Sequence, residues 1–227
     1  MKRIQFLITL SVLLSLVSCL PNKMRVTAVR PTEIKDLAYF EPIAFTYLIQ
    51  KGNKSQYNDS LSVITQKGLT KVLGMYKPRF PLSEKIEIDN DTLQYYVQHE
   101  IMYLMNSAMA SKMLKGIKIT PHIDSIMDAR HQRFALAVVA SGFKRDRGNY
   151  GKQIAKGIGI GILTLGMAAP VPIKSNLTLY GIIFDAQNDE IIFYNETNPR
   201  EEDPTVLHTI NRQFWHLFAG YFWKSRH

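Results

Sequence analysis

The chain has almost no cysteine, since Cys19 is the only one in 227 residues. A single thiol excludes an intramolecular disulfide, a dithiol redox pair and a thiolate metal cluster. The chain also lacks a stretch of about 20 apolar residues, which a membrane-spanning helix requires. Its two most apolar stretches, at residues 4–17 and 157–172, are both shorter than that. The sequence therefore predicts neither a disulfide scaffold nor a helical membrane domain.

The first stretch is typical of an export signal. Lys2 and Arg3 precede a short apolar run, and small residues follow before Cys19. Leu16-Val17-Ser18-Cys19 resembles the bacterial lipobox, in which the signal is cut before the cysteine and the thiol is acylated. An ordinary signal peptide with a chance cysteine is the alternative. We expect residues 1–18 to be a lipoprotein signal peptide and Cys19 to carry a palmitate-type lipid. We expect the lipid to lie in the outer membrane, with the protein facing the periplasm, because Leu20 stands where an inner-membrane retention signal has aspartate.

Acidic residues are scarce relative to basic ones, with 19 Asp and Glu against 28 Lys and Arg. Loss of Lys2 and Arg3 with the signal leaves 26 basic residues and a net charge of +7. Such a surface could meet anionic headgroups, acidic glycans or nucleic acid, or could simply be solvated. For an exported chain we expect a membrane contact through the N-terminal lipid and no nucleic-acid partner.

The rest of the chain predicts a tether at residues 19–33 and a single α/β domain at 34–227. Residues 37–48 are rich in aromatic and β-branched side chains and indicate a strand, with Pro42 marking an edge or a bulge. The apolar run 134–140 indicates a buried strand, and residues 177–185 and 190–195 indicate an antiparallel pair with Asp185 and Asp189 at its turn. Helical spacing marks 55–75, 91–115, 121–130 and a last helix capped by Asp203 and Pro204 that runs to Phe222. The fold class is α/β, with a single mixed sheet flanked by helices.

Glycine gathers in the second apolar stretch, at Gly157, Gly159, Gly161 and Gly166. The segment fails the phosphate-loop pattern, and Ile162 stands where a dinucleotide motif needs its third glycine. Its glycines permit close backbone approach, so we expect a Gly-rich crossover between two central strands that makes or flanks a protein contact. Burial within the monomer is the alternative.

Catalytic and metal patterns are absent from the sequence. His99-Glu100 begins like a zinc-protease helix, but Tyr103 occupies the place of the second histidine. His208 and His216 share a broad side of the last helix without a carboxylate between them, and no base is marked for Ser141. We expect no enzyme activity, no cofactor and no metal, with an envelope hydrolase that uses Ser141 or these histidines as the alternative. The methionine-rich stripe of 91–115 is either core packing or a plastic partner surface.

One combination of features resembles a known family. A strand at 134–140 is followed by Thr164-Leu165-Gly166, Ala168-Ala169-Pro170 and Pro172, and then by 177–185 and Ile191-Ile192-Phe193-Tyr194-Asn195. With the lipobox, this resembles bacterial lipoproteins that have the TolB-N-terminal-like α/β fold, a group that includes the curli-secretion lipoprotein and the Lpo activators of penicillin-binding proteins. The resemblance covers about residues 133–222. It implies an interaction or assembly module of the cell envelope, with an envelope protein or another copy of the chain as its partner, and it supplies no catalytic residue.

Overall fold

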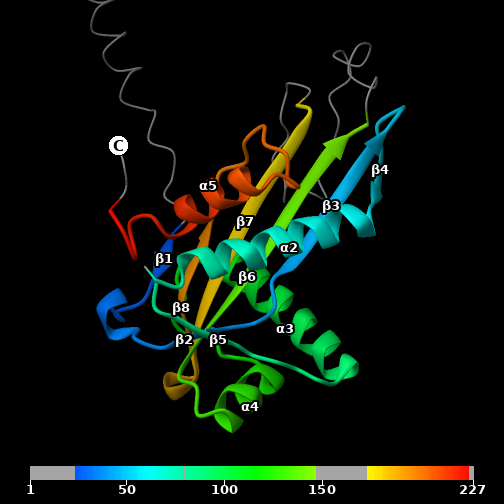
Figure 1. Ribbon diagram of the computed structural model, residues 1–227. Coiled ribbons are helices and arrows are strands. Elements are labelled where there is room, and N and C mark those ends of the chain that lie inside the picture. Colours follow the sequence, from blue (N-terminus) through cyan, green and yellow to red (C-terminus); the bar gives the residue numbers. More distant parts are fainter. Residues whose placement is uncertain (1–23, 79, 147–172, 225–227) are drawn as a thin grey trace, which may run out of the picture.

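The computed structural model describes residues 24–78, 80–146 and 173–224. They form one mixed sheet between two layers of helices, with α2 and α5 on one face and α3 and α4 on the other (Figure 1). The prediction of a single mixed sheet flanked by helices is confirmed. Cys19 and the four glycines at 157–166 lie outside the described residues, and so does the predicted contact of the Gly-rich segment.

The sheet is built around one long central strand, β6. The strands are β1 (Arg25–Val26), β2 (Leu37–Tyr39), β3 (Ile43–Gln50), β4 (Lys54–Tyr57), β5 (Leu82–Lys85), β6 (Phe134–Arg145), β7 (Ser175–Asp185) and β8 (Glu190–Glu196). Their order is β1-β8-β7-β6-β2-β5, and β3 continues beside β6 beyond β2 and pairs with β4. The single strand predicted over residues 37–48 is therefore two strands, and Pro42 lies in the break between them and not at an edge or a bulge of one strand.

The link between the two longest strands differs from the predicted crossover. β6 and β7 are antiparallel neighbours, paired from Phe134 with Asp185 to Lys144 with Ser175. A crossover connects parallel strands, whereas antiparallel neighbours are connected at one end of the sheet. The chain therefore leaves β6 and enters β7 at the same end.

The helices begin and end at identifiable residues. They are α2 (Asp59–Tyr76), α3 (Asp91–Ala110), α4 (Pro121–Ala129) and α5 (Leu207–Phe218), and there are 3-10 turns at Pro31–Glu33 and Ala186–Asn188. Asn58 and Asn90 cap α2 and α3 by accepting hydrogen bonds from backbone amides three residues later. The predicted cap of α5 is wrong, because Val206 precedes that helix. Asp203 instead pairs with Lys144, their charged atoms being 2.6 Å apart.

The expected tether is shorter than 19–33, because the chain joins the fold soon after Met24. Arg25 and Val26 pair with Tyr194 and Phe193 of β8. The Thr27 amide donates to the carbonyl oxygen of Ile192 at 3.0 Å. Only residues 20–24 lie between the predicted lipid site, Cys19, and β1.

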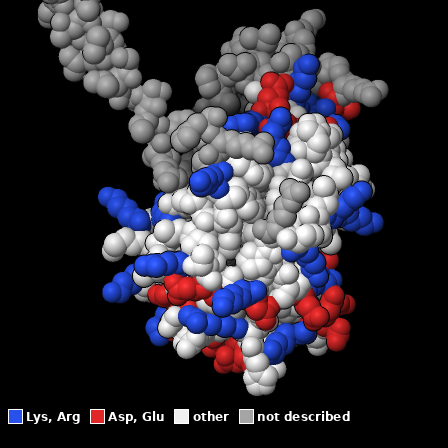
Figure 2. Space-filling view, turned by 60° about the vertical axis from the view of Figure 1, so that its left-hand side comes forward, with Lys and Arg blue, Asp and Glu red and all other residues white. Residues whose placement is uncertain are grey.

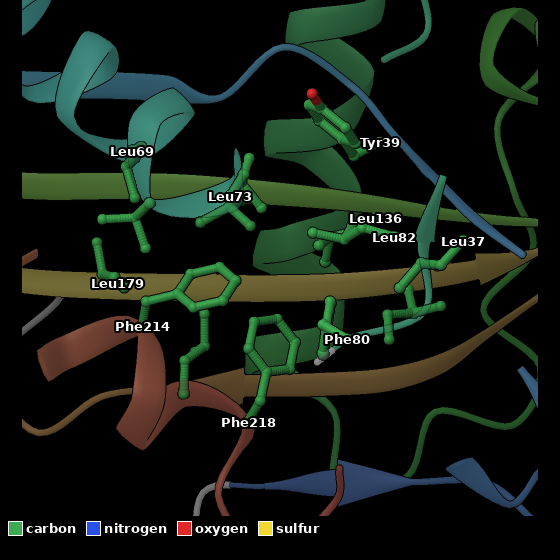
Figure 3. Packing of buried hydrophobic residues seen from close by; sticks show 14 of the residues in the cluster. Leu37, Tyr39, Leu69, Leu73, Phe80, Leu82, Leu136, Leu179, Phe214 and Phe218 are labelled. Carbon is green, nitrogen blue, oxygen red and sulfur yellow. The ribbon is translucent and has the colours of Figure 1, made fainter. Parts of the chain in front are cut away.

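The α2 and α5 side of the sheet holds an aromatic core (Figure 3). Phe80, Phe214 and Phe218 are almost fully buried, and their ring centroids lie 5.0 to 6.1 Å apart. Leu69 and Leu73 of α2 pack beside them. This core stabilises one face of the sheet, and the candidate site lies on the opposite face.

Candidate functional site

A pocket of about 220 Å³ opens between α3 and the sheet, on the face opposite α2 and α5. We call it the α3 pocket. Strands β3, β6, β7 and β8 and helix α3 supply its lining residues, which are Phe45, Tyr47, Met102, Met105, Asn106, Met109, Val139, Ser141, Tyr180 and Tyr194. Seven of these ten side chains are aromatic or methionine, so the pocket is suited to an apolar group.

Helix geometry explains the position of the pocket. Met102 and Met109 are seven residues apart, close to two turns, so both lie along one side of α3. They are only partly buried, whereas Met105, nearer the centre of the packed side, is 4% exposed. Of the two roles left open by the sequence, core packing is therefore found for Met105, and Met102 and Met109 lie at an opening.

Helix α3 also carries exposed tyrosines. Tyr95 lies seven residues before Met102 and is 58% exposed, and Tyr103 is 65% exposed. His99 lies between them, with its ring 4.3 Å from that of Tyr95. Tyrosine is enriched where proteins bind one another, because its ring is apolar and its hydroxyl tolerates water. Helix α3, which lines the pocket with its methionines, thus also exposes aromatic side chains to solvent.

Two tyrosines of the pocket lining, Tyr180 and Tyr194, have raised pKa values. Burial is the main cause that raises the pKa of Tyr180 and of Tyr194, and the Glu196 carboxylate adds to it. The Tyr194 hydroxyl donates to Glu196 Oε2 at 2.9 Å. A phenol with a raised pKa stays protonated at neutral pH, so the lining offers hydroxyl groups without charge. The arrangement can bind an apolar group and orient it with a few hydrogen bonds.

A second polar cluster secures the outer side of α3. The His122 ring stacks on Tyr96 with a centroid distance of 5.3 Å, and His122 Nδ1 lies 2.6 Å from Glu100 Oε1. Burial alone would raise the pKa of Glu100, but hydrogen bonds from His122 and from the Ile123 amide help to lower it. This cluster ties α4 to α3 and keeps the helix in place over the pocket.

The structure separates the residues of the alternative hydrolase site. Ser141 lines the α3 pocket and His99 belongs to α3, whereas His208 and His216 belong to α5 on the opposite face of the sheet. Burial, followed by the charges of Arg200 and Arg212, lowers the pKa of His216. The sheet therefore keeps Ser141 apart from both histidines of α5.

The two aspartates expected simply as turn residues do more than that. Asp185 is fully buried and accepts two hydrogen bonds of 3.0 Å from Arg133. Asp189 adopts a left-handed backbone with φ of 49° and accepts from Lys118 and from the Ile119 amide. Both pairs hold the turn between β7 and β8 against its neighbours, which a local sequence pattern does not reveal.

Within residues 24–78, 80–146 and 173–224, no cluster of three or more His, Cys, Asp or Glu side chains is arranged to hold a metal ion. In that same part of the chain no helix is both long and apolar enough to cross a bilayer.

No model of a known protein family matches the chain, and no curated protein sequence matches it. The α3 pocket is therefore identified from the structure alone and not from a related protein. The heptad spacing of Tyr95, Met102 and Met109 is the sequence signal that could have located it.

Proposed function

We propose that the chain is a lipoprotein of the cell envelope, anchored at Cys19 in the outer membrane and facing the periplasm, whose domain binds a partner protein through the α3 pocket. The observation that carries the proposal is the apolar pocket, which is lined partly by tyrosines and bordered by a helix that exposes Tyr95 and Tyr103. An apolar centre surrounded by amphipathic side chains matches the anatomy of protein interfaces. The lipobox-like Leu16-Val17-Ser18-Cys19 supports the location.

The volume of the pocket indicates the size of the group it receives. An apolar cavity of about 150 Å³ holds a benzene ring, and the α3 pocket measures about 220 Å³. One phenylalanine or leucine side chain fits such a space. The partner therefore presents an apolar side chain, and the exposed Tyr95 and Tyr103 contact the surface around it. Buried apolar anchors of this kind contribute most of the binding energy in many interfaces.

The anchor is tested by Cys19→Ala. Acyl chains contribute roughly 0.8 kcal/mol for each buried methylene, so an acylated chain stays with membranes at high salt and leaves them only in detergent. The variant is expected to appear as an uncut precursor or in the soluble fraction. If it fractionates like the parent chain at high salt, the lipid anchor is wrong.

Partner binding is tested with a photoreactive benzophenone side chain placed at Tyr103 in intact cells. Met75 on α2 is the matched control, since it is 52% exposed and lies on the opposite face. We expect a discrete cross-linked species from position 103 and none from position 75. Equal products from both positions, or none from either, would refute binding at this site. A product of twice the mass of the chain would identify another copy as the partner.

A further inference from the structure

Strand β1 lies beside the segment that follows α3, at one edge of the sheet. Residues 24–28 and 112–115, together with Glu190, border an open hollow of about 600 Å³. We call this region the β1-edge surface. Met113 is 70% exposed and Val26 is 45% exposed, and Lys112 and Lys115 flank Met113 at the surface. The region therefore presents apolar tips between ammonium groups.

We propose that the β1-edge surface lies against an anionic lipid bilayer, an orientation that rests on the proposed anchor at Cys19. Met24 follows Cys19 by five residues. Even fully extended, five residues reach at most about 18 Å. A domain of this length is about 40 Å across. An anchor at Cys19 thus keeps β1 nearer to the lipid than the far side of the domain.

The chemistry of this surface suits that position. Methionine and valine tips enter the boundary between headgroups and acyl chains, while lysine ammonium groups remain at the level of the phosphates. Each lysine near an anionic leaflet contributes about 1 kcal/mol. Arg25, Lys112 and Lys115 outnumber the single acid in the lining, Glu190. Figure 2 shows basic side chains, with acidic ones among them, on the face that comes forward when the side carrying β1 is turned to the viewer.

The exposure of Met113 is built into the fold. Leu114 is 2% exposed and anchors the turn, and the Ile117 amide donates to its carbonyl oxygen at 3.1 Å. The Ser111 hydroxyl donates to the carbonyl oxygen of Met113 at 2.5 Å. Arg25 donates to the carbonyl oxygen of Ala108 at 2.8 Å, which joins β1 to the end of α3. Met113 is therefore held outward beside the strand that follows the anchor.

The orientation can be measured on the full-length chain, purified with its acyl groups and reconstituted in vesicles of phosphatidylcholine and phosphatidylglycerol. Acylation consumes the thiol of Cys19, so Met113→Cys introduces the only free thiol. An environment-sensitive fluorophore on this thiol should emit at shorter wavelength and be quenched by spin-labelled lipid. The same label at Met75→Cys on α2 should instead be quenched by iodide in water.

Charge-reversal variants provide a second test of the orientation. Lys112→Glu with Lys115→Glu should weaken the lipid contact of the probe about fivefold for each lysine, most strongly at low salt. Lys67→Glu with Lys71→Glu, the same change on α2, should leave it unaltered. An acylated chain whose probe at position 113 stays in water refutes the orientation and leaves the anchor standing. A purified chain whose mass shows no acyl groups refutes the anchor, and the orientation falls with it.

Discussion

Tyr180 and Tyr194 contribute phenol groups to the wall of the α3 pocket, and burial raises the pKa of both. Tyr221, which donates to the carbonyl oxygen of Val29 at 3.0 Å, has its pKa raised to about 12 by burial and by Glu33. A group with a raised pKa in the folded state stabilises the fold fully below its ordinary pKa. These three tyrosines therefore make the fold sensitive to alkali.

Tyr194→Phe tests this sensitivity. Above the ordinary tyrosine pKa of 10.0 the unfolded chain ionises while the folded chain does not, so stability falls as the pH rises. The loss is at most about 1.4 kcal/mol for each pH unit for one tyrosine. In urea unfolding above pH 10, the free energy of unfolding of the variant should fall less steeply than that of the parent. Identical slopes would contradict the neutral, buried state of Tyr194.

Two glycines give opposite predictions for the same substitution. A Cβ at Gly142 would lie 2.4 Å from the carbonyl oxygen of Asn176, a backbone atom that cannot move aside without shifting β7. A Cβ at Gly74 in α2 would meet nothing within 4 Å. Gly142→Ala should therefore destabilise the fold by about 1–3 kcal/mol. Gly74→Ala should stabilise it by about 0.5–1 kcal/mol.

Thermal unfolding of both variants measures the difference. A stable Gly142→Ala protein would show that β6 and β7 are not as close as the register indicates. A destabilised Gly74→Ala protein would show that the space beside Gly74 in α2 is filled and not open.

At the scale of elements, α5 depends on its aromatic side. Phe218 is fully buried among Phe80, Phe193 and Phe214, with ring centroids 5.0 to 5.3 Å away. Phe218→Ala removes these contacts and leaves a cavity, which should cost about 3–5 kcal/mol. His208→Ala, on the exposed side of the same helix, should change stability by less than about 0.5 kcal/mol. Chemical denaturation compares the two, and similar losses would contradict the packing of α5 on the sheet.

The elements that the sequence predicts well are those with a long periodic signal. Residues 134–140, 177–185 and 190–195 all fall in strands, because their apolar side chains are buried in the centre of the sheet. Strands β1, β4 and β5 are short and have no such signal, and Lys54–Tyr57 is exposed throughout. These strands form because a neighbouring strand offers free backbone groups, which is a tertiary effect that a local pattern does not contain.

The same limit applies to the site. The methionine-rich stripe of α3 is visible in the sequence, and its division into core and opening is not. That division depends on tertiary packing, which places Phe45 and Tyr47 of β3 in the same pocket lining as Met102 and Met109. The predicted helix 91–115 also continues too far, because Ser111 is extended and the chain turns there toward β1.

At the scale of the whole molecule, we propose that two surfaces have separate roles. The β1-edge surface holds the domain against the bilayer, and the α3 pocket receives the partner. Arg25 connects them, since its guanidinium lies 5.3 Å from the ring of Tyr194, a pocket residue, while its backbone belongs to β1. Partner binding would thus occur close to the membrane surface.

The central claim is that the α3 pocket receives an apolar side chain of a partner protein. Met109→Trp places a larger ring in the pocket, and Met75→Trp makes the same change on exposed α2. The measurement is the yield of cross-linked partner from benzophenone at Tyr103 in intact cells, with both variants first shown to unfold at the temperature of the parent. We predict that Met109→Trp abolishes the cross-linked species and that Met75→Trp leaves it unchanged. An undiminished yield from Met109→Trp would contradict the claim, because the partner would then bind without entering the pocket.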